Sequence, residues 1–425
     1  MTLSPPADRS ATAKLHDQYQ AVRSLSETLC QPLAIEDYGI QAMADVSPPK
    51  WHLAHTTWFF ETFLLLPYLP AYQAFHPTYN YLFNSYYEAV GERHPRPQRG
   101  LLSRPTVDQV YQYRAHVDQA MAALLQQQGD QSPVAALTIL GLHHEQQHQE
   151  LLLTDLKYNL AQNPLRPAYR QDLPQAMANP GPLKFVEFSG GLHTIGHQGE
   201  GLAADEFSFD NEGPAHQVYL QDFALANRLV TNGEYLAFME AGGYQTPSYW
   251  LAEGWATIQD QGWQAPLYWE QQDGQWWIMT LAGLQPLGID QPVTHLSYFE
   301  ADAFAQWYGC RLPTEAEWEV ATRDVPPQGN LLAADYLHPQ PAAGIEPLEQ
   351  LYGDTWEWTQ SAYLPYPGFR PAAGAVGEYN GKFMCSQMVL RGGSCVTPPG
   401  HIRPTYRNFF PPSARWQFSG IRLAT

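Results

Sequence analysis

The sequence predicts an α+β protein of two domains, in which a helical bundle precedes a domain with little regular secondary structure. From residue 11 to about residue 159, Leu, Ala and Gln recur in long periodic segments and Gly is rare. After Tyr158, Pro and polar residues dominate up to Pro182, and beyond it Gly, Pro and Trp become frequent while the periodicity turns short. We therefore expect a helical domain over residues 11–162, a linker over 163–181 and a second domain over 182–425.

The helical half contains enough candidate helices for a four-helix bundle. Thr106 and Ser132 are typical N-terminal signals for two of them. In such bundles, metal sites are built from inward-facing side chains of neighbouring helices. The candidate helices cover residues 12–28, 35–44, 49–65, 107–128 and 132–159.

In the second half, the frequent Gly and Pro residues and the short periodicity predict short helices and strands joined by tight turns. Gly and Pro set the turns, while Trp and buried charged residues stabilise a fold with little regular structure. The candidate strands cover residues 185–188 and 216–220, and the candidate helices cover residues 232–241, 298–308 and 315–322.

The composition narrows the class of protein. The chain has 425 residues, 44% of them hydrophobic and 15% charged, which is typical of a globular protein. A formal net charge of −19 without a long Lys/Arg run argues against nucleic-acid and anionic-membrane partners. No stretch approaches the ~18 apolar residues of a membrane span, and the N-terminal residues lack a signal-peptide core. Four scattered cysteines without a CxxC pair fit a reduced, cytoplasmic protein, and a homo-oligomer is compatible with the sequence.

The most informative segment is Gly141-Leu-His-His-Glu-Gln-Gln-His-Gln-Glu150. On a helix, His144 and His148 lie over each other on one face, so their imidazoles can bind one metal ion. His143 points elsewhere. The same string fits the HExxH pattern of zinc hydrolases, in which Glu145 is the general base. The two histidines predict a metal site and leave the metal open.

The C-terminal half resembles the fold of formylglycine-generating enzyme, an α+β fold of the C-type-lectin kind. The resemblance covers residues 182–425 and rests on motifs that occur in order. They include Phe209-Asp-Asn-Glu-Gly-Pro-Ala-His216, Gly309-Cys-Arg-Leu-Pro-Thr-Glu-Ala-Glu-Trp-Glu319, Gly353-Asp-Thr-Trp-Glu-Trp358 and Arg391-Gly-Gly-Ser394. Formylglycine generation is not expected, because Cys395 has no second cysteine after it to complete a copper-binding pair.

The N-terminal half resembles a DinB-type helical bundle. Joined to the second half, it resembles the sulfoxide synthases of ergothioneine biosynthesis (the EgtB family). Trp51-His-Leu-Ala-His55 matches the segment with the first iron ligand of that family. The resemblance implies that Fe²⁺ is bound by His55, His144 and His148. We expect His52 to be a packed or hydrogen-bonded helix residue.

The resemblance also implies a reaction. With iron(II) and O₂, the family joins a thiol sulfur to C2 of the imidazole of N-α-trimethylhistidine (hercynine) as a sulfoxide. A phenol near the metal could supply a proton. Tyr86 and Tyr87 resemble the tandem phenols of one branch of the family, and Tyr363 matches the catalytic loop of another.

Further positions match the substrate-binding residues of the family. Those for hercynine are Gln147, Tyr366 and Asn408, and Phe409 and Phe410, directly after Asn408, are further substrate-binding positions. The arginines that match the family's thiol-carboxylate site are Arg93 and Arg96, with Arg99 and Arg104 close by. Members that use γ-glutamylcysteine have an acidic residue at position 410. Phe410 cannot bind a glutamyl ammonium group, so we expect cysteine to be the preferred donor.

Three alternatives stay open at this point. One is a 5-histidylcysteine sulfoxide synthase of the ovothiol pathway, which couples unmethylated histidine at C5. Another is a zinc hydrolase built on HExxH. The third is a non-catalytic ligand-binding module with a structural metal.

Overall fold

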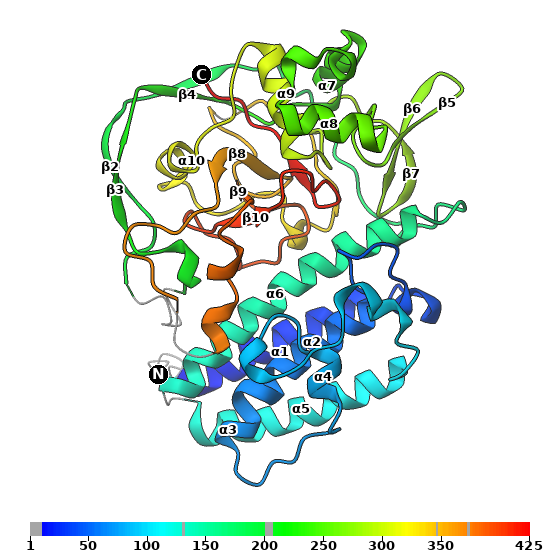
Figure 1. The fold of residues 1–425 in the computed structure, drawn as a ribbon, viewed down its shortest axis with the longest axis vertical. Helices are drawn as coiled ribbons and strands as arrows, with labels where there is room; N and C mark the ends of the chain where they lie inside the picture. Colours follow the sequence, from blue (N-terminus) through cyan, green and yellow to red (C-terminus); the bar gives the residue numbers. More distant parts are fainter. Residues whose placement is uncertain (1–10, 130–131, 200–206, 346, 372–374) are drawn as a thin grey trace, which may run out of the picture. The chain divides into compact units, whose positions relative to one another are not determined.

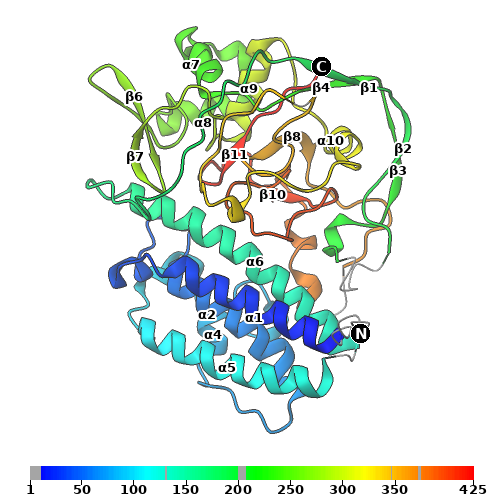
Figure 2. The ribbon, with the colours of Figure 1, turned by 180° about the vertical axis from the view of Figure 1, so that it is seen from behind.

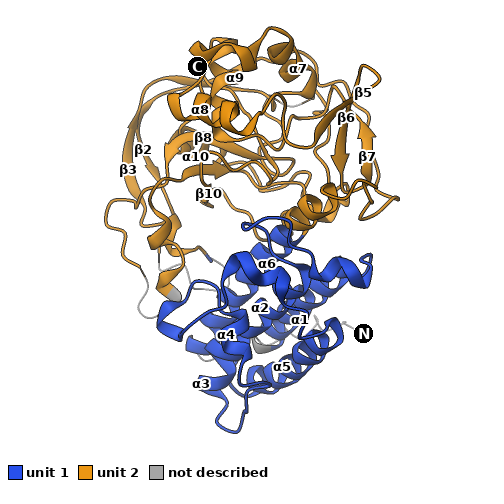
Figure 3. Cartoon of the chain, turned by 45° about the vertical axis from the view of Figure 1, so that its right-hand side comes forward, with its two compact units in different colours: residues 1–152, 202–207 blue, residues 153–201, 208–425 orange. Residues whose placement is uncertain are grey.

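A computed structural model describes residues 11–129, 132–199, 207–345, 347–371 and 375–425. The chain forms two compact units, unit 1 with residues 1–152 and 202–207, and unit 2 with residues 153–201 and 208–425 (Figure 3). The change from unit 1 to unit 2 falls inside one long helix. The predicted two-domain α+β class is confirmed, and the predicted linker over 163–181 stays a prediction. Of the helices described, none has the length and apolar character that crossing a membrane requires.

Unit 1 is helical. Its longer helices run side by side in both ribbon views (Figures 1 and 2). The helices are α1 (Ala11–Cys30), α2 (Pro49–Phe60), α3 (Leu66–Tyr68), α4 (Tyr79–Phe83), α5 (Val107–Gln128) and α6 (Ser132–Ala161), which continues into unit 2. Short 3₁₀ turns lie at Ile35–Gly39, Glu88–Val90 and Arg96–Leu101.

Local sequence signals explain where two of these helices begin and bend. At the start of α5, the Gln109 N–H donates to Thr106 Oγ1, and the Thr106 N–H donates back to Gln109 Oε1, as in a capping box. Between α2 and α3 the chain forms a π-helical turn, Glu61–Leu65. Buried Glu61 accepts hydrogen bonds of 2.6 Å from the Tyr72 and Tyr113 hydroxyls.

One predicted helix of unit 1 is wrong. The segment 35–44 forms only the 3₁₀ turn Ile35–Gly39. The Asp37 carboxylate accepts a hydrogen bond from the Ala34 N–H, and the chain becomes extended at Ile40, directly after Gly39. Glycine is a poor helix former, so the turn does not continue. The short helix α4 was missed.

Unit 2 contains small sheets rather than one large one. The four-stranded sheet has the order β10-β9-β8-β11, with β11 parallel to β8 and the other neighbours antiparallel. The other antiparallel sheets are β1-β4, β2-β3 and β5-β6-β7. The strands are β1 (Phe185–Phe188), β2 (Gly191–Ile195), β3 (His216–Leu220), β4 (Phe223–Ala226), β5 (Trp269–Gln272), β6 (Gln275–Thr280), β7 (Gly283–Pro286), β8 (Trp356–Ala362), β9 (Met388–Arg391), β10 (Asn408–Phe410) and β11 (Ser419–Gly420).

The predicted helices of unit 2 are confirmed, with the first one residue shorter than expected. They are α7 (Asn232–Glu240), α9 (Tyr298–Tyr308) and α10 (Glu315–Thr322), and α8 (Ala252–Gln261) was missed. The predicted strands 185–188 and 216–220 correspond to β1 and β3.

Buried ion pairs support the irregular segments of unit 2. Arg422 and Glu357 are both fully buried and lie 2.8 Å apart. The Arg422 guanidinium also donates to the backbone carbonyls of Ala226, Glu349 and Gln350. Burying a backbone carbonyl without a partner is costly, so such an arginine replaces the hydrogen bonds that a sheet would provide.

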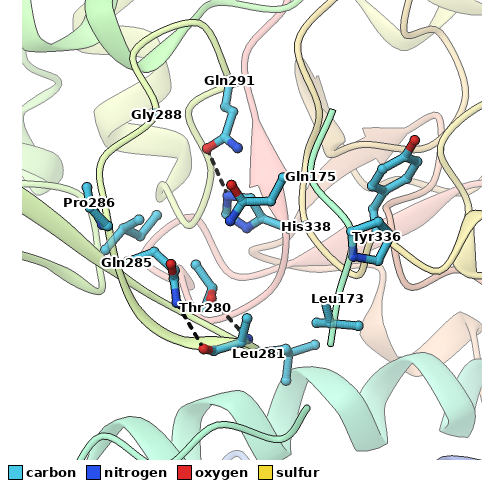
Figure 4. A pocket seen from close by; sticks show the side chains of 13 residues that line it. Leu173, Gln175, Thr280, Leu281, Gln285, Pro286, Gly288, Gln291, Tyr336 and His338 are labelled. Atoms are coloured by element: carbon cyan, nitrogen blue, oxygen red, sulfur yellow. Dashed lines mark hydrogen bonds between the residues drawn. The ribbon is translucent and has the colours of Figure 1, made fainter. Parts of the chain in front are cut away.

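Unit 2 also has a small cavity of about 170 Å³ (Figure 4). Its polar lining is neutral and includes Gln175, Gln285, Gln291 and His338. His338 Nε2 lies 3.2 Å from Gln291 Oε1. The predicted site residues are not among the residues that line this cavity.

Candidate metal centre

Three histidines of unit 1 converge on one point. His55 comes from α2, and His144 and His148 come from successive turns of α6. One ring nitrogen of each lies within 4.8 Å of the corresponding nitrogens of the other two, and all three side chains are buried. The Nε2 atoms of His55 and His144 are 3.2 Å apart. The sequence prediction of these three residues as one group is confirmed by this geometry.

The rings are held so that nitrogen lone pairs face a common centre. His55 Nδ1 donates to the Phe83 carbonyl oxygen at 2.6 Å, which leaves Nε2 for a metal. His148 Nδ1 lies 2.9 Å from His52 Nδ1 and is therefore also occupied. Hydrogen bonds at the second ring nitrogen are what metal-bound histidines normally have.

Tryptophans fix the plane of His55. The Trp51 ring stacks on it at a centroid distance of 4.5 Å and an angle of 11°, and Trp58 stacks at 5.5 Å and 15°. Both tryptophans are buried. They stand one helical turn before and one after His55, so regular helix geometry brings them to the same ligand.

Burial keeps the three imidazoles neutral. Removal from water lowers the pKa of His144 to about 4 and lowers the pKa values of His55 and His148 well below the ordinary value. A metal ligand must be the neutral imidazole. Three such nitrogens suit iron, zinc or copper and leave coordination positions for other ligands. The residues present therefore fit a bound transition metal.

Glu145 does not belong to this centre. It is fully buried, and its carboxylate accepts from Ser26 Oγ at 2.6 Å, Arg23 Nη1 at 2.9 Å and Arg114 Nη2 at 3.1 Å. Burial alone would raise its pKa, but the two guanidinium groups and the hydrogen bond from Ser26 together hold the pKa below its ordinary value. A carboxylate bound by two arginines cannot serve as the general base of an HExxH hydrolase. The hydrolase alternative is therefore not supported.

The tandem tyrosines lie in the loop after α4. Tyr87 is buried, and its ring packs against Trp58, which in turn stacks on His55. Tyr86 is half-buried, and its hydroxyl accepts from Arg96 Nη1 at 2.5 Å. Tyr87 is thus linked to the ligand shell through one aromatic ring.

The predicted arginines differ in their surroundings. Arg93 is exposed and pairs with Glu88 at 2.8 Å. Arg96 is half-buried and bonds to Tyr86 and to the Asp45 carbonyl. Arg99 is buried, and its guanidinium lies 3.3 Å from the centroid of the Trp51 ring. Gln147 is half-buried on α6, one residue before His148.

The remaining predicted residues belong to unit 2. Tyr363 is fully buried, stacks on Phe409 at 4.1 Å, and its hydroxyl accepts from Asn211 Nδ2 at 2.9 Å. The Tyr366 hydroxyl donates to Glu315 Oε2 at 3.2 Å and accepts from Arg391 at 3.0 Å.

Residues 408–410 form strand β10 and are half-buried. Asn408 Oδ1 accepts from the Phe409 N–H, and the Phe410 ring meets Trp416 edge-on at 5.6 Å. The three thus lie together on one short strand.

Sequence reasoning missed some residues around the ligands. Trp51 and Trp58 stand at i−4 and i+3 from His55, and this helical spacing could have shown that they flank it. In the sequence, Arg99 stood out only as an arginine close to Arg93 and Arg96. No spacing rule could have shown that it stacks on Trp51, because it lies in a different segment.

Family models match both halves of the chain. Residues 18–152 match the DinB superfamily, and residues 171–338 and 337–425 match the sulfatase-modifying factor enzyme 1-like domain. The chain is also similar to a formylglycine-generating enzyme of Streptomyces coelicolor, with 29% identity over 52% of this chain and 83% of that one.

Two relatives are similar over about two thirds or more of the chain. A hercynine oxygenase of Mycolicibacterium smegmatis is 36% identical over 67% of this chain and 70% of its own. A hercynine oxygenase of Mycolicibacterium thermoresistibile is 32% identical over 89% of this chain and 87% of its own. Because the identity exceeds 30% over two thirds or more of both chains in each comparison, this chain belongs to the hercynine oxygenase family.

Proposed function

We propose that this protein is an iron(II)- and O₂-dependent sulfoxide synthase of ergothioneine biosynthesis. It joins the sulfur of a thiol, preferably cysteine, to C2 of hercynine. The observation that carries the proposal is the set of three buried, neutral imidazoles in a member of the hercynine oxygenase family. Three protein ligands leave coordination positions for small-molecule ligands, as a coupling reaction requires.

Iron(II) bound by His55, His144 and His148 would supply the redox chemistry that activates O₂. The contribution of the chain is to keep these ligands neutral, dry and fixed in orientation. Stacking by Trp51 and Trp58 and the bond to Phe83 serve that purpose for His55.

The tandem phenols are the proposed proton donors. Coupling must compete with simple oxidation of the thiol to a sulfinic acid, and a positioned phenol can favour coupling by supplying a proton. Tyr87 is the better supported of the two, because it packs on Trp58 beside His55. Tyr86 is held by Arg96, one of the arginines proposed for the carboxylate of the thiol substrate.

Hercynine has two features that need recognition. Its carboxylate needs hydrogen-bond donors, and we propose Gln147 of unit 1, Asn408 of unit 2 and Tyr366 of unit 2 as separate candidates. Its quaternary ammonium cannot donate a hydrogen bond and is usually held by aromatic faces. Phe409 is a candidate because it is half-buried and stacks on the rings of Tyr363 and Phe383.

The decisive experiment is an O₂-uptake assay with product identification. Purified protein receives iron(II), hercynine and either cysteine or γ-glutamylcysteine, and products are identified by mass spectrometry and NMR. We expect a hercynyl sulfoxide coupled at C2, with faster turnover for cysteine. Omission of iron and replacement of hercynine by histidine are the controls. Coupling of histidine at C5 would assign the protein to the ovothiol-type reaction instead, and O₂ uptake without any C–S product would contradict both.

A further inference from the structure

Inside unit 1, His52, which is not one of the three metal ligands, contacts the ligand His148. His52 is buried on α2, three residues before His55. Its Nδ1 lies 2.9 Å from Nδ1 of His148, and the two ring centroids are 5.2 Å apart. The distance is that of a good hydrogen bond. One of these two nitrogens therefore carries the proton and the other accepts it.

Metal binding through His148 Nε2 would fix the direction of this hydrogen bond. His148 needs a lone pair on Nε2 to act as a ligand, so as a neutral ring it keeps its proton on Nδ1. His148 Nδ1 is then the donor, and His52 Nδ1 is the acceptor. For His55, the Phe83 carbonyl accepts from Nδ1 in the same way. The His52 side chain thus accepts the Nδ1 proton of His148, as the Phe83 carbonyl accepts that of His55.

The surroundings of His52 explain how it can hold a fixed position. The Trp51 ring packs edge-on against it at 5.8 Å, and the side chain is only 3% exposed. On α2 the i, i+3 spacing places His52 and His55 on the same face. Helix α2 therefore supplies the ligand His55 directly, and its His52 holds the ligand His148 of α6.

We propose that His52 is a positioning residue, which holds His148 in the Nδ1–H tautomer with Nε2 facing the metal. A neutral imidazole without this acceptor can place its proton on either nitrogen and can rotate, so fewer molecules present a lone pair to the ion. Outer partners of metal-bound histidines typically change metal affinity by about 10–100-fold. The prediction concerns metal affinity and does not depend on which reaction the centre performs.

The test uses three substitutions at one position. In His52→Asn, the amide oxygen stands where Nδ1 stood and can still accept the proton. In His52→Gln, the amide lies one bond further out, near the place of Nε2. His52→Leu removes the acceptor and keeps an apolar side chain. Metal-free protein is titrated with cobalt(II), whose absorption bands report the ligands, and the dissociation constant is measured for each variant.

We expect roughly 10–100-fold weaker cobalt binding in His52→Leu and His52→Gln, and binding within about threefold of the original protein in His52→Asn. His143→Leu is the matched control, since His143 is the neighbour of a ligand but stacks on Phe207 instead of joining the centre. It should bind cobalt as the original protein does. Circular dichroism and thermal melting identify any variant that fails to fold. If His52→Leu does not fold, the Asn and Gln variants still decide the question.

Two results would overturn the proposal. One is unchanged cobalt affinity in folded His52→Leu or His52→Gln. The other is an Asn variant that loses as much affinity as the Gln variant, because that would mean the whole ring, and not the acceptor, is what matters. Normal metal binding without C–S coupling in the unaltered protein would contradict the proposed function but leave the role of His52 intact.

Discussion

Units 1 and 2 both bury charged and polar side chains, but they use them differently. In unit 1 the buried ions form a compact group in which Arg23 and Arg114 bind Glu145, and the backbone carbonyls to which Arg114 donates, those of Leu53 and Arg23, belong to helices α2 and α1. In unit 2, arginines such as Arg422 pair with a carboxylate and also donate to backbone carbonyls of irregular segments.

The difference bears on function. Because α6 is regular, the same two turns present Glu145 to a charged core and His144 and His148 to the metal centre. In unit 1, adjacent residues of α6 thus face two different environments, a charged group with Arg23 and Arg114 and a neutral set of ligands with His55. In unit 2, a candidate substrate residue such as Tyr366 is itself part of the ion-pair network, through Glu315 and Arg391.

The largest effect is expected for the metal ligands. Replacing His55, His144 or His148 by Ala should lower metal affinity by roughly 100-fold or more, since even an outer partner of a ligand costs about 10–100-fold. C–S coupling should fall with it. Metal content by mass spectrometry and product formation are the measurements, with His143→Ala as control. Full iron occupancy in His55→Ala would rule out the three-histidine centre.

Substitutions of candidate proton-donor tyrosines in the two units test which unit supplies the proton. Phe at position 87 or 86 keeps the ring and removes the proton, so the product should shift from sulfoxide towards cysteine sulfinic acid. A general acid typically contributes ~10²–10⁴-fold. Tyr363→Phe should shift the ratio less, because the Tyr363 hydroxyl is buried against Asn211. Both products are quantified for each variant. A large shift in Tyr363→Phe alone would place the proton donor in unit 2.

The same contrast shows what the sequence could predict. His144 and His148 were found because helical spacing fixes which side chains share a face. The strands and helices that were predicted in unit 2 also lie where local patterns are strong. The spacing could not tell that Glu145 points into a charged core, because its partners Arg23 and Arg114 come from α1 and α5. The residue pair His52–His148 was also beyond reach, since it depends on how two helices pack.

The ion pairs offer the next comparison. Removing one partner of a buried ion pair typically costs about 3–5 kcal/mol, because a buried charge is left without a partner. We expect this loss of unfolding free energy for Glu357→Gln in unit 2, and a smaller loss for Glu145→Gln in unit 1, because Arg23 keeps Asp118 and Arg114 keeps Glu27 as a carboxylate partner. Urea unfolding measures it. Cobalt affinity of the folded Glu145→Gln protein should stay within about threefold, in contrast to the roughly 10–100-fold effect expected for a partner of a ligand. A strong loss of cobalt affinity in Glu145→Gln would show that the ion pairs of Glu145 also help to hold the three histidine ligands.

Donor selectivity tests unit 2 further. Phe410→Asp would introduce the carboxylate that a glutamyl ammonium needs, and a hydrogen bond to a charged group contributes about 1.5–3 kcal/mol. We therefore expect kcat/KM for γ-glutamylcysteine to rise by about tenfold or more relative to cysteine. The measurement is a competition assay with both thiols, and Phe410→Asn is the uncharged control. An unchanged preference, or a preference for the dipeptide before any substitution, would contradict the role given to Phe410.

The smallest change is expected when the pH is lowered. Imidazoles with ordinary pKa values near 6.5 become protonated between pH 7 and pH 5, and protons would then weaken metal binding to three of them by roughly 10⁴-fold. Burial lowers the pKa of His144 to about 4 and lowers those of His55 and His148, so these rings stay neutral across that range. Cobalt affinity should therefore change by less than about tenfold from pH 7 to pH 5.

In unit 2 burial acts on an acid, and it raises the pKa of Asp354 to about 7, so this carboxyl takes up a proton over the same range. A group with a raised pKa of this kind favours the folded state more as the pH falls. Cobalt titrations at several pH values, alongside unfolding of Asp354→Asn as the control for unit 2, measure the two responses separately. A steep loss of cobalt binding between pH 7 and pH 6 would show that water reaches the ligands of unit 1.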